Sequence, residues 1–233
     1  MSDNYDFLAG EVLLFDKDLD WTSFDLVQRV RNQLCRHLRI KKLKVGHTGT
    51  LDPKATGLLI VCTGKATGRI EELQLGEKEY IATLKLGATT PSYDTETAED
   101  RHFETGHLSE ALVRQTLATF VGDSLQMPPL FSAIKVDGKR AYNAARRGRQ
   151  LELAARPVNI PELELLAMKE DELSIRVVCS KGTYIRALAR DIGAALKCGA
   201  YIVQLRRTRI GTARIEEAMT IDSFLNRLKE IEN

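Results

Sequence analysis

The chain has 233 residues, of which 43% are hydrophobic and 28% charged, a composition typical of a globular protein and unlike that of a disordered one. No apolar run is long enough to cross a membrane, and the polar start MSDNYDF lacks the regions of a signal peptide, so we expect a cytoplasmic protein. The four cysteines are scattered without a C-x-x-C pair, which indicates reduced thiols and no structural zinc site.

The net charge of +2 is close to neutral, but charge is unevenly distributed along the chain. Positive residues gather in three segments, at 36–44, 139–149 and 206–209. Locally basic surfaces on a near-neutral protein favour a polyanionic partner. For each segment taken alone, a solvated helix face is the alternative interpretation.

Apolar patterns predict two elements near the N-terminus. EVLLFD (11–16) is expected to form a buried strand. TSFDLVQRVRNQLCRHL (22–38) is expected to form a helix, because its apolar residues recur on one face. Ser23 is the predicted N-cap of this helix.

The segment GHTGTLDPKATG (46–57) surrounds a single carboxylate, Asp52, with glycines, threonines and a proline. This composition disfavours regular structure and predicts a stiff loop from which one aspartate projects. The glycines would let a ligand approach the main chain closely. A turn without any chemistry is the alternative interpretation.

The middle of the chain contains two predicted strands, a long loop and a helix. LLIVCT (58–63) reads as a core strand, and KEYIATLKLG (78–87) alternates cleanly between apolar and polar residues. Residues 88–107 are polar without a core period, which is typical of a long functional loop. A helix is expected from Ser109 to Phe120, closed by Gly122.

The C-terminal part is predicted to mix strands and helices without a βαβ rhythm. Its expected elements are a turn at Asp137-Gly138, a short basic helix at Ala141–Arg147, strands at 158–168 and 172–179, a helix at 183–196, a strand at 201–211 and a helix at 220–231. The predicted fold class is therefore α+β with one mixed, largely antiparallel sheet flanked by helices and loops. We expect residues 1–233 to form a single domain.

Several kinds of chemistry do not fit the glycine-rich segment. TGKAT (63–67) resembles the end of a phosphate-binding loop, but Leu59 and Ala66 stand where that motif requires Gly and Ser or Thr. There is no G-x-S-x-G elbow for a nucleophilic serine and no second acid nearby for paired-carboxylate hydrolysis. One rigid carboxylate in a basic surround fits a group that acts on a nucleic-acid base or sugar.

Four blocks of the chain resemble the TruB family, the bacterial tRNA pseudouridine synthases. They are GHTGTLDPKATGLLIVCTGKAT, KEYIATLKLGATT, PPLFSAIKVDGKRAY and SKGTYIRALARDIG…CGAYIVQLRRTRIG. The resemblance implies the pseudouridine synthase fold and isomerisation of the uridine at position 55 in the T-arm loop of tRNA. It implies no metal, ATP or organic cofactor, no obligate protein partner, and a monomer.

The resemblance also implies which residues form the site. Asp52 corresponds to the catalytic aspartate, Tyr80 to the tyrosine that stacks on the uracil, and Arg186 to the arginine that pairs with the catalytic carboxylate and keeps it ionised. The implied substrate-binding residues are Lys17 near the entrance, where we expect a phosphate contact, His47 as a wedge that opens the RNA loop, Tyr184 and Leu205 in the pocket, and Arg146 and Arg147 as phosphate contacts. Core packing is the alternative for Tyr80 and Leu205, and an ordinary exposed lysine for Lys17.

The chain departs from the family pattern in some places. The family usually has Lys-Pro-x-Gly after the first strand, where this chain has Asp18 and Asp20, so we expect a less rigid, more acidic loop. Residues 88–107 correspond to the family's RNA-gripping loop, which is mobile without RNA. The chain ends at Asn233, where many relatives carry a PUA RNA-binding domain, so no such domain is expected.

Two other functions remain open at this point. One is a tRNA-binding or RNA-folding protein whose isomerase activity is dispensable. The other is the catalytic subunit of a guide-RNA particle, which the long loop at 88–107 and the expected lack of a PUA domain disfavour. The simultaneous presence of Asp52, Tyr80 and Arg186 favours the enzyme.

Overall fold

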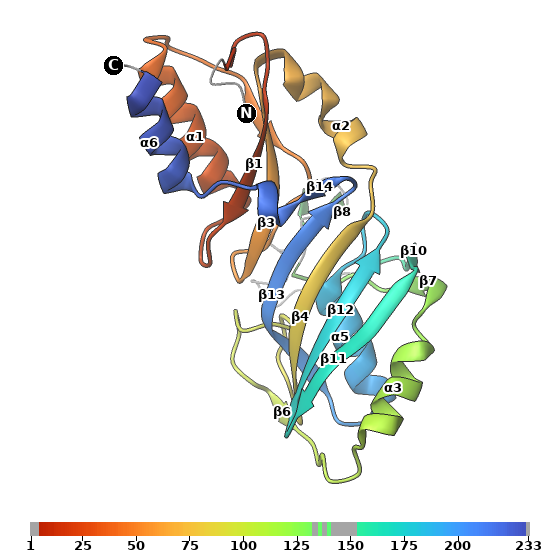
Figure 1. The fold of residues 1–233 in the computed structure, drawn as a ribbon. Coiled ribbons are helices and arrows are strands. Elements are labelled where there is room, and N and C mark those ends of the chain that lie inside the picture. Colours follow the sequence, from red (N-terminus) through yellow and green to blue (C-terminus); the bar gives the residue numbers. More distant parts are fainter. Residues whose placement is uncertain (1–4, 132–134, 137–138, 141–152, 232–233) are drawn as a thin grey trace. The chain divides into compact units, whose positions relative to one another are not determined.

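The computed structural model describes residues 5–131, 135–136, 139–140 and 153–231 (Figure 1). The chain forms two compact units, Met1–Glu79 with Arg206–Asn233, and Tyr80–Leu205. The single-domain organisation expected from the sequence stays a prediction. No helix in the described part of the chain is long and apolar enough to cross a membrane.

The first unit is built around the strand β3 (Ala55–Thr63). The strand β1 (Val12–Lys17) pairs with it antiparallel, with Lys17 opposite Gly57. The short strand β2 (Val45–His47) also pairs with β3. The predicted strands at 11–16 and 58–63 are therefore confirmed, but the second begins earlier, inside the glycine-rich segment.

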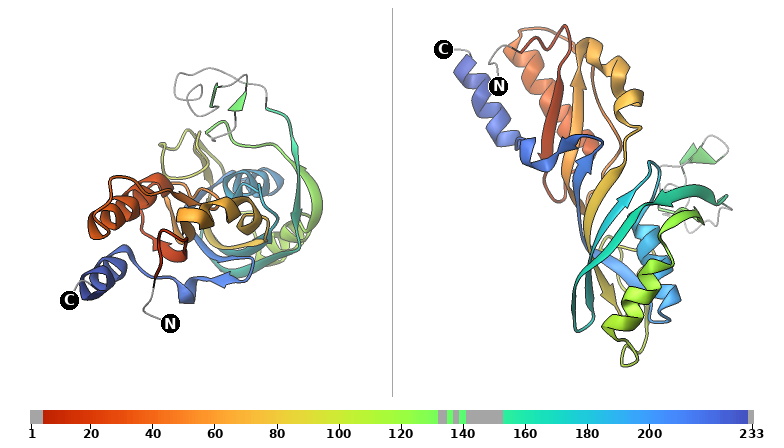
Figure 2. Two further views of the ribbon diagram at one scale, coloured as in Figure 1. Left: turned by 90° about the horizontal axis from the view of Figure 1, so that it is seen from above. Right: turned by 45° about the vertical axis from the view of Figure 1, so that its right-hand side comes forward.

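Two apolar clusters cover the two faces of β3, which explains why LLIVCT is apolar throughout. The helices α1 (Ser23–His37) and α6 (Ile221–Ile231) pack side by side over one face (Figure 2). Leu59 and Val61 belong to the core on that face. Leu58, Ile60 and Cys62 belong to a second core, next to the short helices η1 (Gly64–Arg69) and α2 (Ile70–Leu73).

The helix α1 starts one residue earlier than the sequence predicts. Thr22, not Ser23, is its N-cap, since the Thr22 hydroxyl accepts from the backbone N–H of Asp25 at 3.0 Å. The Asp25 carboxylate in turn accepts from the backbone N–H of Thr22 at 2.9 Å, which completes a capping box. The Ser23 hydroxyl is thereby left for other contacts.

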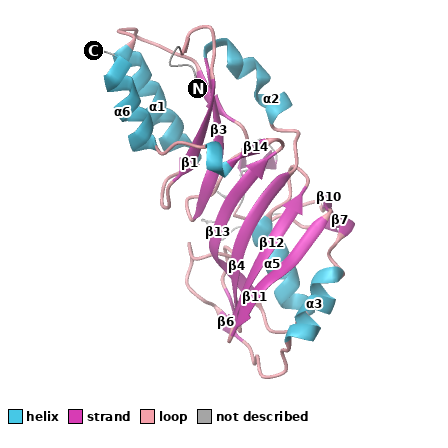
Figure 3. Cartoon of the chain, viewed as in Figure 1, coloured by secondary structure: helices cyan, strands magenta, loops and turns pink. Residues whose placement is uncertain are grey.

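The second unit contains a sheet in which β4 (Lys78–Leu86), β12 (Glu172–Cys179) and β11 (Glu162–Lys169) follow one another, with part of β13 (Ala200–Ile210) at the other side of β4 (Figure 3). The strand β4 alternates as predicted, because every second side chain is buried. The helices α5 (Ile185–Ala195) and α3 (Glu110–Ala118) pack against each other, and α3 contacts β11 (Figure 2). Both helices confirm predicted ones.

The predicted strand at 158–168 is in fact two strands with different partners. β10 (Arg156–Ile160) pairs antiparallel with β7 (Gly122–Gln126), which the sequence did not predict. β11 begins at Glu162 and pairs with β12. Pro161 lies at the break, where its missing N–H and fixed φ interrupt a ladder.

Residues 88–107 form a short strand pair and turns in the second unit, and the mobility that the sequence predicts for them without RNA stays a prediction. The strands β5 (Ala88–Thr89) and β6 (Arg101–His102) pair with each other. Asp94 forms a bridge with Ile202, whose N–H donates to the carbonyl of Tyr93 at 3.0 Å. Polar residues can be buried here because they form hydrogen bonds with one another. A search for apolar periodicity does not detect structure of this kind.

A small antiparallel pair flanks the predicted turn at Asp137-Gly138. It consists of β8 (Lys135–Val136) and β9 (Lys139–Arg140). The turn itself and the predicted basic helix at 141–147 lie outside the described residues.

Candidate active site

Asp52 lies in the loop just before β3, and its surroundings are fixed by a buried arginine. The Arg207 side chain is 1% exposed. Its Nε donates to the carbonyl of Leu58 at 2.8 Å and its Nη2 to the carbonyl of Gly49 at 3.1 Å. Because these carbonyls lie on either side of Asp52, the guanidinium ties both ends of the loop together.

The glycines of this loop serve the protein's own packing. Gly57 has φ +102°, and a Cβ placed there would lie 2.3 Å from the carbonyl oxygen of Arg207. From the sequence, the glycines are expected to let a ligand approach the main chain closely. At Gly57 it is the main chain of Arg207 that approaches. The stiffness predicted for the loop thus has an internal cause.

Lys17 is completely buried at the end of β1. Its Nζ donates to the carbonyls of Asp18 at 2.8 Å and Trp21 at 2.6 Å. Burial lowers the pKa of Lys17 to about 8, while the negative charge of Asp52 opposes this shift. A surface contact with phosphate, as predicted, does not fit this buried position, and Lys17 is instead an internal cation that attracts Asp52.

His47 lies on β2 and is half-buried. Burial and, to a smaller extent, the charge of Arg207 lower the pKa of His47, so its imidazole is neutral near pH 7. Its Nδ1 is buried and has no hydrogen-bond partner among the described residues. The wedge role of His47 stays a prediction.

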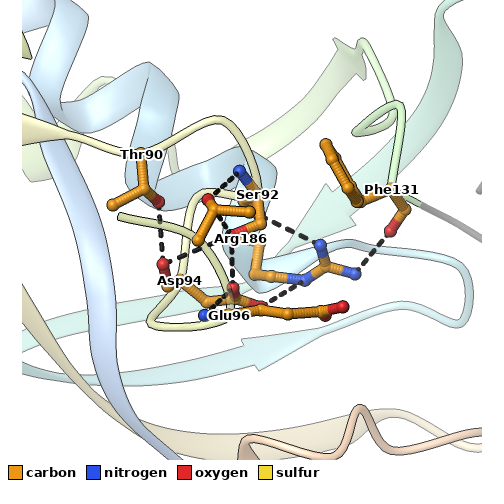
Figure 4. A network of polar contacts seen from close by, with 7 residues as sticks. Thr90, Ser92, Asp94, Glu96, Phe131 and Arg186 are labelled. Atoms are coloured by element: carbon orange, nitrogen blue, oxygen red, sulfur yellow. Dashed lines mark hydrogen bonds and ion pairs between the residues drawn. The ribbon is translucent and has the colours of Figure 1, made fainter. Parts of the chain in front are cut away.

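Arg186 is buried at the start of α5 in the second unit (Figure 4). Its Nη1 donates to the carbonyl of Ser92 at 3.0 Å and its Nη2 to the carbonyl of Phe131 at 2.9 Å. Its Nε lies 3.5 Å from Oδ2 of Asp94. These contacts hold the guanidinium in one orientation.

Asp94 is a site residue that the sequence analysis missed. It is 3% exposed, and its Oδ1 accepts from the Ser92 hydroxyl at 2.6 Å and from the N–H of Glu96 at 2.9 Å (Figure 4). The Thr90 hydroxyl donates to its carbonyl at 2.8 Å. The bond from the N–H of Glu96, two residues after Asp94, makes an Asx turn. An aspartate in a turn-forming segment is therefore the sequence feature that could have pointed to Asp94.

The remaining predicted residues of the second unit are held in regular elements. Tyr80 on β4 is 8% exposed and Leu205 on β13 is 9% exposed. Tyr184 is the N-cap of α5, and the buried Gln126 side chain accepts from its N–H at 2.9 Å and donates to its carbonyl at 3.2 Å. Gln126 thus fixes the backbone two residues before Arg186.

The predicted site residues are divided between the two units. Lys17, His47 and Asp52 lie in the first unit, and the second unit contains Tyr80, Tyr184, Arg186 and Leu205. The predicted pair of Asp52 and Arg186 joins residues of different units and stays a prediction. Arg146 and Arg147 lie outside the described residues.

The second unit also contains a pocket of about 310 Å³. It is lined by Phe120, Ser124, Leu125, Gln126, Met127, Ile160, Leu188, Arg190 and Asp191. None of the predicted site residues lines it. Among the described residues, no group of three or more His, Cys, Asp or Glu side chains could hold a metal ion.

The basic segments differ in how the fold uses them. Arg206 pairs with Asp16 at 2.6 Å, Arg207 is buried, and Arg209 lies 3.7 Å from Glu77. The segment 206–209 is therefore engaged within the first unit, which corrects its prediction as a polyanion surface. The cationic side chains of 36–44 are exposed at Arg36, Arg39, Lys41, Lys42 and Lys44.

The fold is shared with solved pseudouridine synthases. The chain matches the structure of a Cbf5-Nop10-Gar1 complex with a TM-score of 0.68 and 30% identity, covering 94% of this chain and 54% of that one. It matches Cbf5 in the archaeal box H/ACA sRNP Nop10-Cbf5 complex with a TM-score of 0.70 and 26% identity, over 99% and 58% of the two chains. The chain spans a little over half the length of these proteins, and the predicted α+β pseudouridine synthase fold is confirmed.

Sequence comparisons then identify the family. The model of the TruB family pseudouridylate synthase N-terminal domain matches residues 36–185, and that of the tRNA pseudouridylate synthase B C-terminal domain matches 186–233. The tRNA pseudouridine synthase B of Phocaeicola vulgatus is 58% identical over 94% of this chain and 93% of its own length. That of Bacteroides thetaiotaomicron is 56% identical over 97% of both chains. The chain belongs to the TruB family of pseudouridylate synthases, and it is an enzyme of the isomerase class.

Proposed function

We propose that the chain converts the uridine at position 55 in the T-arm loop of tRNA to pseudouridine, with Asp52 as the catalytic carboxylate. Membership of the TruB family supports the isomerisation, and the close curated relatives are named as tRNA pseudouridine synthases. The structural observation that carries the assignment is one carboxylate on a loop whose two ends are tied by buried Arg207. Buried Lys17 attracts this carboxylate from within the same unit.

The reaction needs no change in composition, because the C1′–N1 bond breaks and a C1′–C5 bond forms within one nucleotide, while C5 loses a proton and N1 gains one. An ionised carboxylate must therefore reach the base–sugar junction of a uridine that has left its stack. Ejecting the base costs a few kcal/mol, which the half-buried ring of His47 would offset by replacing lost contacts. Tyr80 would stack on the uracil, and Arg186, held by Asp94 and two carbonyls, would offer a fixed positive charge to Asp52.

In this proposal the T-arm is a sufficient substrate and is gripped by residues 88–107. The enzyme acts as a monomer in the cytoplasm, without a protein partner. It is a tRNA-modifying enzyme, and the RNA-folding role is secondary to isomerisation. The exposed cations of 36–44 contribute phosphate contacts without base specificity.

The test is to incubate the protein with an unmodified tRNA transcript, without added cofactor, and to map pseudouridine by site. Asp52→Asn should bind this tRNA within about tenfold of the wild type while losing turnover almost completely. Asp222→Asn, which removes an exposed carboxylate from α6, is the control and should keep full activity.

Two results would contradict the proposal. Substantial pseudouridine formation by Asp52→Asn would remove Asp52 from the chemistry. Tight tRNA binding by the wild type without any modification at position 55 would favour the tRNA-binding alternative instead.

A further inference from the structure

We propose that Ser23 and Asp20 are positioning residues that fasten the chain on both sides of Asp52. This inference rests on the proposed catalytic role of Asp52. Asp20 lies between β1 and α1, and Ser23 is the first residue of α1. Both are remote in sequence from the loop that they contact. Neither touches the reacting atoms in this proposal, so each acts through the backbone of the Asp52 loop.

Ser23 holds the residue immediately before Asp52 by two hydrogen bonds. Its hydroxyl accepts from the N–H of Leu51 at 2.8 Å and donates to the carbonyl of the same residue at 3.1 Å. Ser23 is 1% exposed and Leu51 is 3% exposed, so both bonds are shielded from water. A single hydroxyl that satisfies both backbone groups of one residue fixes the position and the orientation of that peptide.

Asp20 holds the residues immediately after Asp52. Its N–H donates to the carbonyl of Pro53 at 2.9 Å, and its carboxylate accepts from Nζ of Lys54 at 2.7 Å. Asp20 has φ 64°, in the left-handed region that favours glycine and that aspartate tolerates. At the position where the family usually has glycine, this chain thus keeps the backbone conformation and adds a side-chain contact with the catalytic loop.

The segment that carries these residues is itself fixed. Buried Lys17 donates to the carbonyls of Asp18 and Trp21, on either side of Asp20. Thr22 and Asp25 close the start of α1 by their capping box. The departure from the family pattern at 18–20 therefore does not produce the looser loop that the sequence predicts, because internal bonds replace the missing proline and glycine.

Loss of the Ser23 contacts should slow isomerisation more than it weakens tRNA binding. A misplacement of a catalytic group by about 1 Å can cost roughly 100-fold in rate. Asp52 needs an accurate position only in the reaction, whereas phosphate contacts elsewhere supply most of the binding. Single-turnover pseudouridine formation and the tRNA dissociation constant of the full chain separate the two effects.

Ser23→Ala should lower the single-turnover rate by about 10- to 100-fold with a dissociation constant within about threefold of the wild type. Ser109→Ala is the control, since it removes the N-cap hydroxyl of another helix, α3, where that hydroxyl accepts from the N–H of Leu112. It should destabilise the fold similarly but keep the rate within about threefold. Equal rates for the two variants would overturn the inference.

Lys54→Met tests the other side of Asp52 and avoids the risk that a buried change prevents folding. It removes the ion pair with Asp20, whose partners are partly exposed, and should lower the single-turnover rate about two- to fivefold at unchanged affinity. An unchanged rate in a folded Lys54→Met protein would remove Asp20 from the proposal. A wild type that forms no pseudouridine would refute the proposed function. An active wild type with unaffected variants would refute only the positioning role, so the two failures can be distinguished.

Discussion

Lys17 is a cation that the fold buries close to its proposed catalytic carboxylate. Its ammonium has two backbone carbonyls as partners and an attractive interaction with Asp52, yet burial still outweighs these contacts and lowers its pKa from 10.5 to about 8. The protonated form therefore costs the folded state free energy near neutral pH. Such a cost at a functional loop is expected where a charge serves the chemistry more than the stability.

This burial predicts how stability depends on pH. Between about pH 8 and 10.5 the unfolded chain keeps a proton on Lys17 that the folded chain has lost, so the free energy of unfolding rises with pH. Lys17→Met cannot show this rise. The stability difference between wild type and variant should move in favour of the wild type by at most about 3 kcal/mol across that window. Urea denaturation at several pH values measures it, and a constant difference would show that Lys17 titrates normally.

Single residues show where sequence reasoning succeeded and where it stopped. The glycine-rich pattern correctly predicted irregular structure around Asp52, although the ends of the segment belong to β2 and β3. Ser23 was expected to cap a helix, but its hydroxyl bonds to Leu51, a partner 28 residues away. Arg207 was counted as surface charge and is buried. The Asx turn at Asp94 was a local signal that went unused, whereas its pairing with Arg186, far along the chain, leaves no local pattern.

At the level of elements, periodicity predicted most helices and the alternating strand β4, since burial on one face leaves a regular trace. The continuous apolar run of β3 was also recognised, whereas the strands of the small β7–β10 pair were harder. The strand β7 has the sequence GDSLQ, with only one buried residue, and carries little apolar signal. The boundary between β10 and β11 depends on Pro161 and on a change of pairing partner, which apolar periodicity does not register.

The strand β3 offers a test of the close packing next to the Asp52 loop. Gly57→Ala should destabilise the first unit by about 2 kcal/mol or more, because φ is +102° and the new Cβ would meet the Arg207 main chain. Gly68→Ala is the control, since a Cβ added at Gly68 would have nothing within 4 Å, and should change stability by no more than about 0.5 kcal/mol. Urea denaturation compares the two. Equal, small effects would show that β13 can move away from Gly57.

For the whole molecule, the distribution of charge says more than its sum. The net charge is only +2, and the arginines of 206–209 are engaged in internal pairs or buried. The cations of 36–44 are exposed on the first unit and have no comparable role in the fold. A polyanionic RNA would therefore bind through the first of the basic segments and not through the last. The sequence alone could not separate these two segments, because both are rich in Lys and Arg.

This difference predicts a specific change in the salt dependence of tRNA binding. Each phosphate contact releases counterions, so removing three contacts should reduce the slope of log affinity against log salt by about 2. We expect this smaller slope for a variant that combines Lys41→Gln, Lys42→Gln and Lys44→Gln. The control replaces Arg69 and Arg114 by Gln, two exposed arginines that pair with acids in their own helical segments, and should keep the wild-type slope. Filter binding of an unmodified tRNA at several salt concentrations measures the slopes. If the lysine variant keeps the wild-type slope, the segment 36–44 does not contact RNA, and the binding surface must be sought elsewhere.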